Sequence, residues 1–224
     1  MSVAVNIMLQ KLLINSFNFL LPSFCSYCKA LLKDNSVFCG TCADKIRPVV
    51  SKKISLTATK SMNVFSVGAY TEPLKTLIMA KKWSDVIACK QMARLIEEKT
   101  VFSQFPCDVL VPIPLHWSRY YWRGYNQAEL IAETLGKKRN IPVSSVLKRI
   151  KKTAYQSKLS AQQRLLNIHS AFSLESQKAA QLKNKHVIII DDLMTTGTTL
   201  YEAGRALLPL KPASITAIVV ARVV

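Results

Sequence analysis

From residue 62 onward, short continuous apolar runs alternate with segments whose apolar residues recur every three or four positions. The continuous runs are typical of buried strands, and they fall at 62–70, 107–114, 145–150, 171–174, 186–190 and 214–223. The helically spaced segments fall at 72–83, 85–99, 126–138, 160–168 and 198–208. Strands that alternate with helices predict an α/β fold in which helices flank a parallel sheet.

The first 24 residues are apolar, but Lys11 and several amides interrupt them. Their larger apolar side chains fall on one helical face, which predicts a helix packed on its own module. A helix lying on a membrane surface is the alternative reading. No basic stretch and no small-residue cleavage site precede Cys25, so we predict no secretory signal and expect a cytoplasmic protein.

Four of the six cysteines form two C-x-x-C pairs separated by ten residues, namely Cys25, Cys28, Cys39 and Cys42. Two such pairs can complete a tetrahedral thiolate shell around Zn²⁺. Disulfides suit a secreted chain, and a redox C-x-x-C comes singly in a βαβ context, so we favour structural zinc. A closed shell leaves no position for a substrate. We expect Cys89 and Cys107 to be buried structural thiols.

The polar stretch 51–60 reads as a connector between two domains. We therefore predict a small module over residues 1–60, with the N-terminal helix and the four zinc-binding cysteines. The α/β domain is predicted to follow over residues 61–224.

The charge of the chain is strongly unbalanced, with 31 Lys and Arg against 13 Asp and Glu and a formal net charge of +18. Such an excess creates a surface potential of several kT, which favours a polyanionic partner such as nucleic acid or a phosphorylated ligand. A soluble protein that uses lysine only to stay dispersed is the alternative.

Candidate functional residues lie close together in the stretch HVIIIDDLMTTGTT, where two acids and a threonine-rich loop follow an apolar run. The run should deliver Asp191 and Asp192 to the carboxyl end of a strand, where open α/β sheets bind ligands. The next loop, with Thr195, Thr196, Gly197, Thr198 and Thr199, leads into a helix and suits a phosphate. Carboxylates accept hydrogen bonds from hydroxyls, so the pair predicts a ribose 5-phosphate site. The alternative is an acid that caps the next helix, beside incidental threonines.

Basic residues mix with aromatic ones in RYYWRGYNQ, which holds Arg119, Arg123 and Tyr125. This mixture suits a single nucleic-acid strand, through phosphate contacts and base stacking. The arginines equally suit a pyrophosphate group, and aromatics packed beside a solvated loop are a third reading. A second basic segment, which we interpret as a flap or a solvated loop, contains Lys151, Lys152 and Arg164.

The stretch VIIIDDLMTTGTT resembles the phosphoribosyl-pyrophosphate motif of type I phosphoribosyltransferases. Together with DVLVPIPLHWSRYYWRGYNQAELIA, LKRIKKTAYQSKLSAQQRLLNIHSAF and the paired C-x-x-C motifs, it resembles the ComF family of competence-related proteins. The resemblance implies that Asp191 and Asp192 hold the ribose hydroxyls and that 195–199 hold the 5-phosphate. It also implies that the loop 115–119 lies where this fold binds pyrophosphate.

Two functions follow from this resemblance. The first is uptake or processing of transforming single-stranded DNA, with a competence helicase or uptake machinery as partner. The second is catalysis by an active phosphoribosyltransferase, in which phosphoribosyl pyrophosphate and Mg²⁺ bind at Asp191, Asp192 and 195–199. The sequence leaves open whether the protein is an enzyme.

Overall fold

The computed structural model describes residues 23–80, 86–115, 124–150, 171–175 and 182–224 of the 224-residue chain. The chain divides into two compact units, Met1–Lys45 and Ile46–Val224. The predicted N-terminal helix, the predicted helix 160–168 and five basic site residues lie outside the described residues. Those five residues are Arg119, Arg123, Lys151, Lys152 and Arg164.

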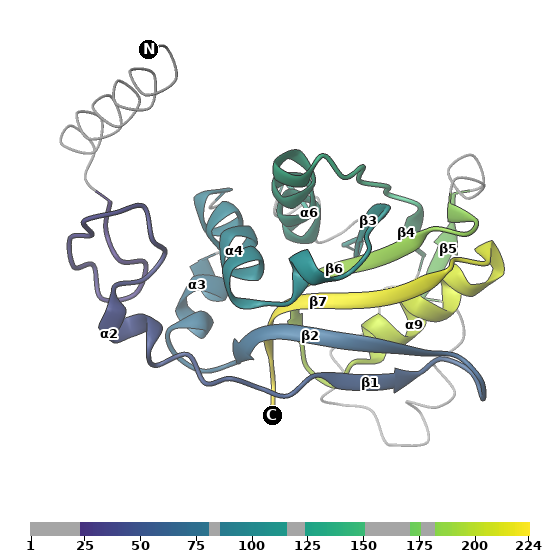
Figure 1. Ribbon diagram of the computed structural model, residues 1–224, viewed down its shortest axis with the longest axis horizontal. Helices are drawn as coiled ribbons and strands as arrows, with labels where there is room; N and C mark the ends of the chain where they lie inside the picture. Colours follow the sequence, from purple (N-terminus) through teal and green to yellow (C-terminus); the bar gives the residue numbers. More distant parts are fainter. Residues whose placement is uncertain (1–22, 81–85, 116–123, 151–170, 176–181) are drawn as a thin grey trace, which may run out of the picture. The chain divides into compact units, whose positions relative to one another are not determined.

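A five-stranded sheet forms the centre of the larger unit, in the order β1-β2-β7-β6-β3 (Figure 1). Its strands are β1 (Lys52–Ser55), β2 (Ser61–Ala69), β7 (Ser214–Arg222), β6 (His186–Met194) and β3 (Val109–Pro112). All neighbouring strands run parallel except β1, which pairs antiparallel with β2. The predicted parallel sheet is therefore confirmed, with one antiparallel edge strand.

The reading of 51–60 as a connector is wrong, because β1 and the turn after it belong to the sheet. The Leu56 N–H donates to the Lys60 carbonyl at 2.8 Å, which closes this hairpin. Ile54 and Leu56 turn toward the interior, while the two lysines and the serine of β1 are exposed. An edge strand with one solvated side carries few apolar residues, so its sequence looks like a polar linker. Residues 46–60 accordingly pack with the larger unit.

Helices cover both faces of the sheet, with α3, α4 and α6 on one face and α9 on the other (Figure 1). They are α3 (Leu74–Ala80), α4 (Val86–Lys99), α6 (Gln127–Arg139) and α9 (Thr198–Leu207), with short 3₁₀ turns at Phe102–Gln104 and Leu208–Leu210. Val187 and Ile189 of β6 share a core cluster with Leu200 of α9. Ile188 and Ile190 point to the other face and are also buried. Burial on both faces explains the unbroken apolar run of β6.

A small second sheet pairs β4 (Leu147–Arg149) with β5 (Phe172–Leu174) in antiparallel register. Both segments were predicted as strands, and both predictions are confirmed. The Arg149 guanidinium lies over the Phe172 ring, 5.6 Å from its centroid. The buried face of this pair, with Leu147 and Phe172, joins the core cluster that includes α9.

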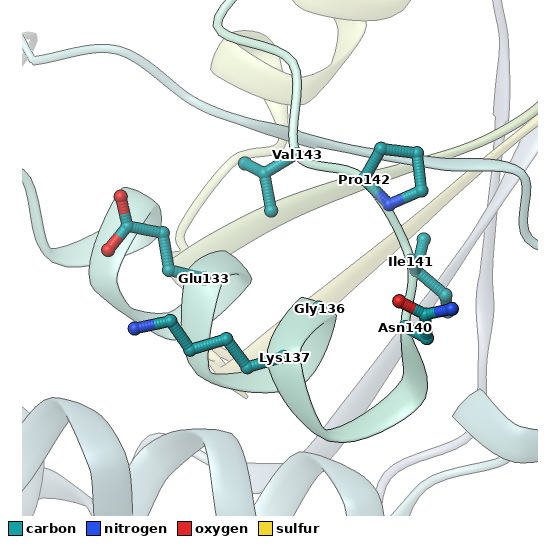
Figure 2. A pocket seen from close by; sticks show the side chains of 7 residues that line it. All are labelled: Glu133, Gly136, Lys137, Asn140, Ile141, Pro142 and Val143. Atoms are coloured by element: carbon teal, nitrogen blue, oxygen red, sulfur yellow. The ribbon is translucent and has the colours of Figure 1, made fainter.

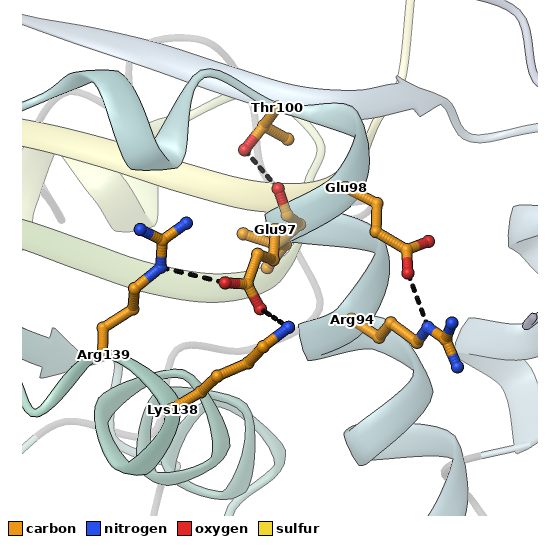
Figure 3. A network of polar contacts seen from close by, with 7 residues as sticks. Arg94, Glu97, Glu98, Thr100, Lys138 and Arg139 are labelled. Carbon is orange, nitrogen blue, oxygen red and sulfur yellow. Dashed lines mark hydrogen bonds and ion pairs between the residues drawn. The ribbon is translucent and has the colours of Figure 1, made fainter. Parts of the chain in front are cut away.

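Helices α4 and α6 pack side by side (Figure 3). Glu97 of α4, whose side chain is 11% exposed, forms ion pairs with α6. Its carboxylate accepts hydrogen bonds from Lys138 Nζ at 2.5 Å and from Arg139 Nε at 2.9 Å. Partial burial would raise the pKa of Glu97, but the hydrogen bonds and positive charges of Lys138 and Arg139 outweigh it and lower this pKa.

The smaller unit is described from residue 23 to residue 45 and contains one short helix, α2 (Gly40–Ala43). Tight turns precede this helix: the Lys29 N–H donates to the Cys25 carbonyl, and the Cys25 N–H donates to the Ala30 carbonyl. The buried side chains include Val37 and Phe38 together with Cys25 and Cys42. In the described part of the chain, no helix has the length and apolar character needed to span a bilayer.

Candidate functional site

The candidate site begins where β3 stops and β6 continues. Pairing between these strands ends at Pro112 and Ile190, and a last backbone hydrogen bond runs from the Ile113 N–H to the Ile190 carbonyl at 2.9 Å. Beyond this point β6 still pairs with β7, up to Met194 opposite Arg222. The carboxyl end of the sheet therefore opens between β3 and β6, at the place where parallel sheets usually bind ligands.

Asp191 and Asp192 lie inside β6 at this opening, rather than after the end of the strand as the sequence suggested. Both side chains are half-buried. The Asp192 N–H donates to Asp191 Oδ1 at 2.9 Å. Because alternate N–H groups of β6 face β3, this contact holds the Asp191 carboxylate at the strand edge that β3 has left.

The segment 195–197 forms a tight turn that leads directly into α9. Gly197 precedes the helix with φ of 90° and ψ of 0°, a left-handed conformation that favours glycine. Thr196 Oγ1 lies 2.9 Å from Thr198 Oγ1, and Thr195 and Thr196 are exposed. The first backbone N–H groups of a helix have no partner within the helix and carry partial positive charge. The turn thus combines hydroxyls and amides in a form that suits a phosphate.

Asn126 is a buried residue of this region whose role sequence reasoning missed. It directly precedes α6 and is only 7% exposed, but its side chain makes no hydrogen bond that caps the helix. Its Nδ2 donates to the Ile113 carbonyl at 3.0 Å, at the end of β3. Asparagine before a helix ordinarily signals a cap, so only the tertiary contact reveals the connection to the sheet.

Of the other predicted ligand-binding residues, Tyr125 is half-buried and directly precedes Asn126. Leu115, the first residue of the loop 115–119, is also half-buried and follows the end of β3. Leu115 thus places the start of the predicted pyrophosphate loop 115–119 at the carboxyl end of β3. The rest of that loop, 116–119, lies outside the described residues, as do residues 120–123.

The structure brings Cys25, Cys28, Cys39 and Cys42 together, with all four Sγ atoms within 4.8 Å of one another. In a tetrahedral shell with Zn–S distances of ~2.3 Å, the sulfurs lie about 3.8 Å apart, and the Cys28 and Cys39 sulfurs are 3.6 Å apart. The four thiols can therefore hold a metal ion, and this cluster lies in the smaller unit.

The electrostatics of the cysteine cluster also fit a cation. Burial would raise the pKa of Cys25, but hydrogen bonds from the backbone of Cys39, Cys28 and Tyr27 outweigh it and lower this pKa to about 6. Burial and the neighbouring thiols raise the pKa of Cys42 to about 12. Four thiolates so close together repel one another, and a bound divalent cation removes that penalty.

The two remaining cysteines lie apart from the cluster. Cys89 is fully buried in α4, as predicted, whereas Cys107 is only half-buried. Burial raises the pKa of Cys107 to about 11, so its thiol stays protonated at neutral pH. Both thiols are therefore consistent with a structural role.

A pocket of about 520 Å³ lies at the C-terminal end of α6, lined by Glu133, Gly136, Lys137, Asn140, Ile141, Pro142 and Val143 (Figure 2). Asn126 and this pocket lie at opposite ends of α6, which spans about 20 Å at ~1.5 Å per residue. The pocket is therefore separate from the acid pair and the threonine turn.

The order of the strands, the acid pair in β6 and the turn before α9 together define a phosphoribosyltransferase-type protein. The family model described as "Phosphoribosyl transferase domain" matches residues 123–223. Competence protein F of Haemophilus influenzae is 32% identical over 196 residues, which cover 82% of this chain and 78% of that protein. The chain therefore belongs to the ComF family of competence-related proteins.

Two other curated proteins and a solved structure are also similar to this chain. The DNA utilization protein YhgH of Escherichia coli is 30% identical over 195 residues, covering 83% of this chain and 78% of that protein. Competence protein ComFC of Bacillus subtilis is 40% identical over 100 residues, covering 45% of this chain and 38% of that protein. Among solved structures, a B. subtilis glutamine phosphoribosylpyrophosphate amidotransferase aligns over 64% of this chain and 26% of that chain, with 15% identity and a TM-score of 0.38.

Proposed function

We propose that this protein handles single-stranded DNA in competence or DNA utilization, and that its phosphoribosyltransferase-type site binds a pentose phosphate group. The observation that carries the proposal is the order of groups along one continuous segment: a half-buried acid pair in β6, then a threonine turn with Gly197 in the left-handed region at the start of α9. Membership in the ComF family, which contains competence and DNA utilization proteins, supports the biological role.

Each part of this site has a chemical task in the proposal. Asp191 and Asp192 accept hydrogen bonds from pentose hydroxyls, and residues 195–199 donate backbone and hydroxyl hydrogens to the phosphate. The net charge of +18 draws the polyanionic strand to the protein. Arg119, Arg123, Tyr125, Lys151, Lys152 and Arg164 are the residues that we propose to contact the strand or a pyrophosphate group.

The second candidate function is an active phosphoribosyltransferase, favoured by the match of the phosphoribosyl transferase domain to residues 123–223. Asp191 and Asp192 supply the carboxylate oxygens that Mg²⁺ prefers, and bound Mg²⁺ would neutralise charge on the leaving pyrophosphate. The chain's own residues would hold the ribose and its 5-phosphate in position for attack at C1.

Calorimetric titration separates the two functions. We expect the wild-type protein to bind single-stranded DNA, with an affinity that falls steeply as salt rises, because phosphate contacts release counterions. DNA affinity that is absent, or independent of salt, contradicts the nucleic-acid role. Failure of phosphoribosyl pyrophosphate with Mg²⁺ to bind the wild-type protein contradicts the enzymatic role.

The matched variant is Asp191→Ala/Asp192→Ala in the same titrations. If both acids bind the pentose, the variant should lose affinity for phosphoribosyl pyrophosphate by at least about 10-fold, since each lost charged hydrogen bond contributes ~1.5–3 kcal/mol. Its zinc content and its thermal unfolding midpoint serve as controls for an intact fold. An unchanged affinity in a folded variant would place the ligand elsewhere.

A further inference from the structure

The gap between β3 and β6 contains two hydrogen bonds that replace a step of the β-ladder. In a regular parallel pair, the bond from the Ile113 N–H to Ile190 is followed by one from the Asp192 N–H to the Ile113 carbonyl. In this structure the Ile113 carbonyl accepts from Asn126 Nδ2 at 3.0 Å. The Asp192 N–H donates to Asp191 Oδ1 at 2.9 Å. One carboxamide and one carboxylate thus occupy the place of a single ladder bond.

The orientation of the Asn126 carboxamide follows from chemistry. A carbonyl oxygen can only accept, so the nitrogen of Asn126 must face Ile113, and its oxygen must point to the other side. That oxygen is buried and has no hydrogen-bond partner among the residues that the structure describes. A buried acceptor without a partner is costly and requires an explanation, such as a bound ligand.

Asn126 is bonded to the β3 side of the gap and Asp191 lies on the β6 side, and Asn126 Oδ1 and the Asp191 carboxylate are both acceptors. A ligand group that donates a hydrogen bond satisfies the buried Asn126 Oδ1, and hydroxyl groups are the donors of a pentose phosphate. Neither side chain suits the phosphate itself, which carries acceptor oxygens. The gap therefore matches the hydroxyl end of the ligand, and the turn 195–199 matches its phosphate end.

We propose that Asn126 is a ligand-binding residue whose Oδ1 accepts a hydrogen bond from a pentose hydroxyl, next to Asp191. This inference rests on the proposed pentose phosphate site and adds to it a residue from α6. The bond to Ile113 holds the carboxamide ready in the free protein, so the acceptor is already positioned when the ligand arrives.

The test compares two probes, ribose 5-phosphate and inorganic phosphate, in calorimetric titrations of the full-length protein. In Asn126→Leu, which has a side chain of similar size without hydrogen-bonding atoms, ribose 5-phosphate should bind about 10-fold more weakly, the effect of one lost hydrogen bond to a buried partner. Inorganic phosphate should bind as in the wild type. The readout is the affinity for ribose 5-phosphate divided by the affinity for inorganic phosphate.

Ser144→Ala is the matched control. Ser144 is also buried, its Oγ has no hydrogen-bond partner among the described residues, and its N–H donates to Leu110 in the middle of β3. Removing this oxygen should leave the affinity ratio unchanged. A lowered ratio in Asn126→Leu, together with an unchanged one in Ser144→Ala, supports the inference.

The remaining outcomes overturn either the inference or the proposed site on which it rests. A loss of affinity that is equal for both probes in Asn126→Leu shows a purely structural role, and unchanged affinities for both probes show no contact; either result overturns the inference. A wild-type protein that binds neither probe overturns the proposed site itself. If Asn126→Leu does not fold, the side-chain NH₂ resonances of wild-type Asn126 decide. Their chemical shifts should change when ribose 5-phosphate is added and not when inorganic phosphate is added. Chemical shifts that ribose 5-phosphate leaves unchanged overturn the inference.

Discussion

Gly197 illustrates how a single residue sets the geometry of the candidate phosphate turn. Its φ of 90° is one that residues with a side chain rarely adopt. A Cβ added there would lie 2.6 Å from Met194 Cε and 3.3 Å from Ile54 Cδ1. The Tyr201 N–H donates to the Gly197 carbonyl at 2.9 Å, so the first turn of α9 depends on this conformation.

Gly197→Ala should therefore lower the free energy of unfolding by about 1–2 kcal/mol, the cost of a Cβ in the left-handed region. It should also weaken the binding of inorganic phosphate, because the turn must shift. Urea unfolding and calorimetry measure the two effects. Gly40→Ala is the control, since a Cβ there meets nothing within 4 Å and φ is ordinary. Equal stability of the two variants would contradict the argument.

At the scale of secondary-structure elements, two neighbouring glutamates of α4 form ion pairs of different kinds. Glu97 is largely covered and contacts two cations of α6, whereas Glu98 pairs with Arg94 of its own helix and is 41% exposed. Exposed pairs within a helix contribute only ~0.3–0.5 kcal/mol. The contact between the helices should contribute more, because the Glu97 carboxylate is shielded from water.

Glu97→Gln should destabilise the protein by about 1 kcal/mol at pH 7. The folded protein lowers the pKa of Glu97, so this contribution is present above the unfolded value of ~4.3 and disappears as pH falls through the lower folded pKa. Urea unfolding at pH 7 and at pH 3 should show the difference between wild type and variant shrinking at acid pH. Glu98→Gln should change stability by only a few tenths of a kcal/mol. A deficit in Glu97→Gln that is equally large at pH 3 would rule out the ion pair as its cause.

At the scale of the whole molecule, the chain combines two compact units that are stabilised in different ways. The larger unit buries apolar side chains on both faces of its sheet. Among the described residues of the smaller unit, few apolar side chains are buried and the cysteine cluster lies among them. So short a segment cannot bury enough apolar surface to fold by that alone.

We therefore expect about one zinc per chain in the purified protein, measured by elemental analysis. A strong chelator should abolish hydrogen-exchange protection in residues 23–45 and leave β6 and β7 protected, because metal binding supplies the folding free energy of such modules. Cys28→Ser should lose the metal, while Cys107→Ala, outside the cluster, should retain it. Protection that survives complete zinc removal contradicts a metal-dependent module.

The sequence alone determined the features that depend on local spacing. Two C-x-x-C pairs bring four thiols within reach of one ion, since each pair spans a single turn. The unbroken run before Asp191 identified the central strand, because a strand covered on both faces has no polar side. Gly197 among the threonines identified the turn before α9, because that signal also lies within a few consecutive residues.

Only the tertiary structure decided how segments far apart in the chain meet. Residues 52–55 look like a linker until β2 pairs with them, because an edge strand exposes most of its side chains. The contact of Asn126 with Ile113 crosses a loop, and the end of the β3–β6 ladder joins residues from separate strands. The periodicity of apolar residues indicates which positions of an element face the core. Hydrogen-bond partners across a sheet depend instead on which strands become neighbours.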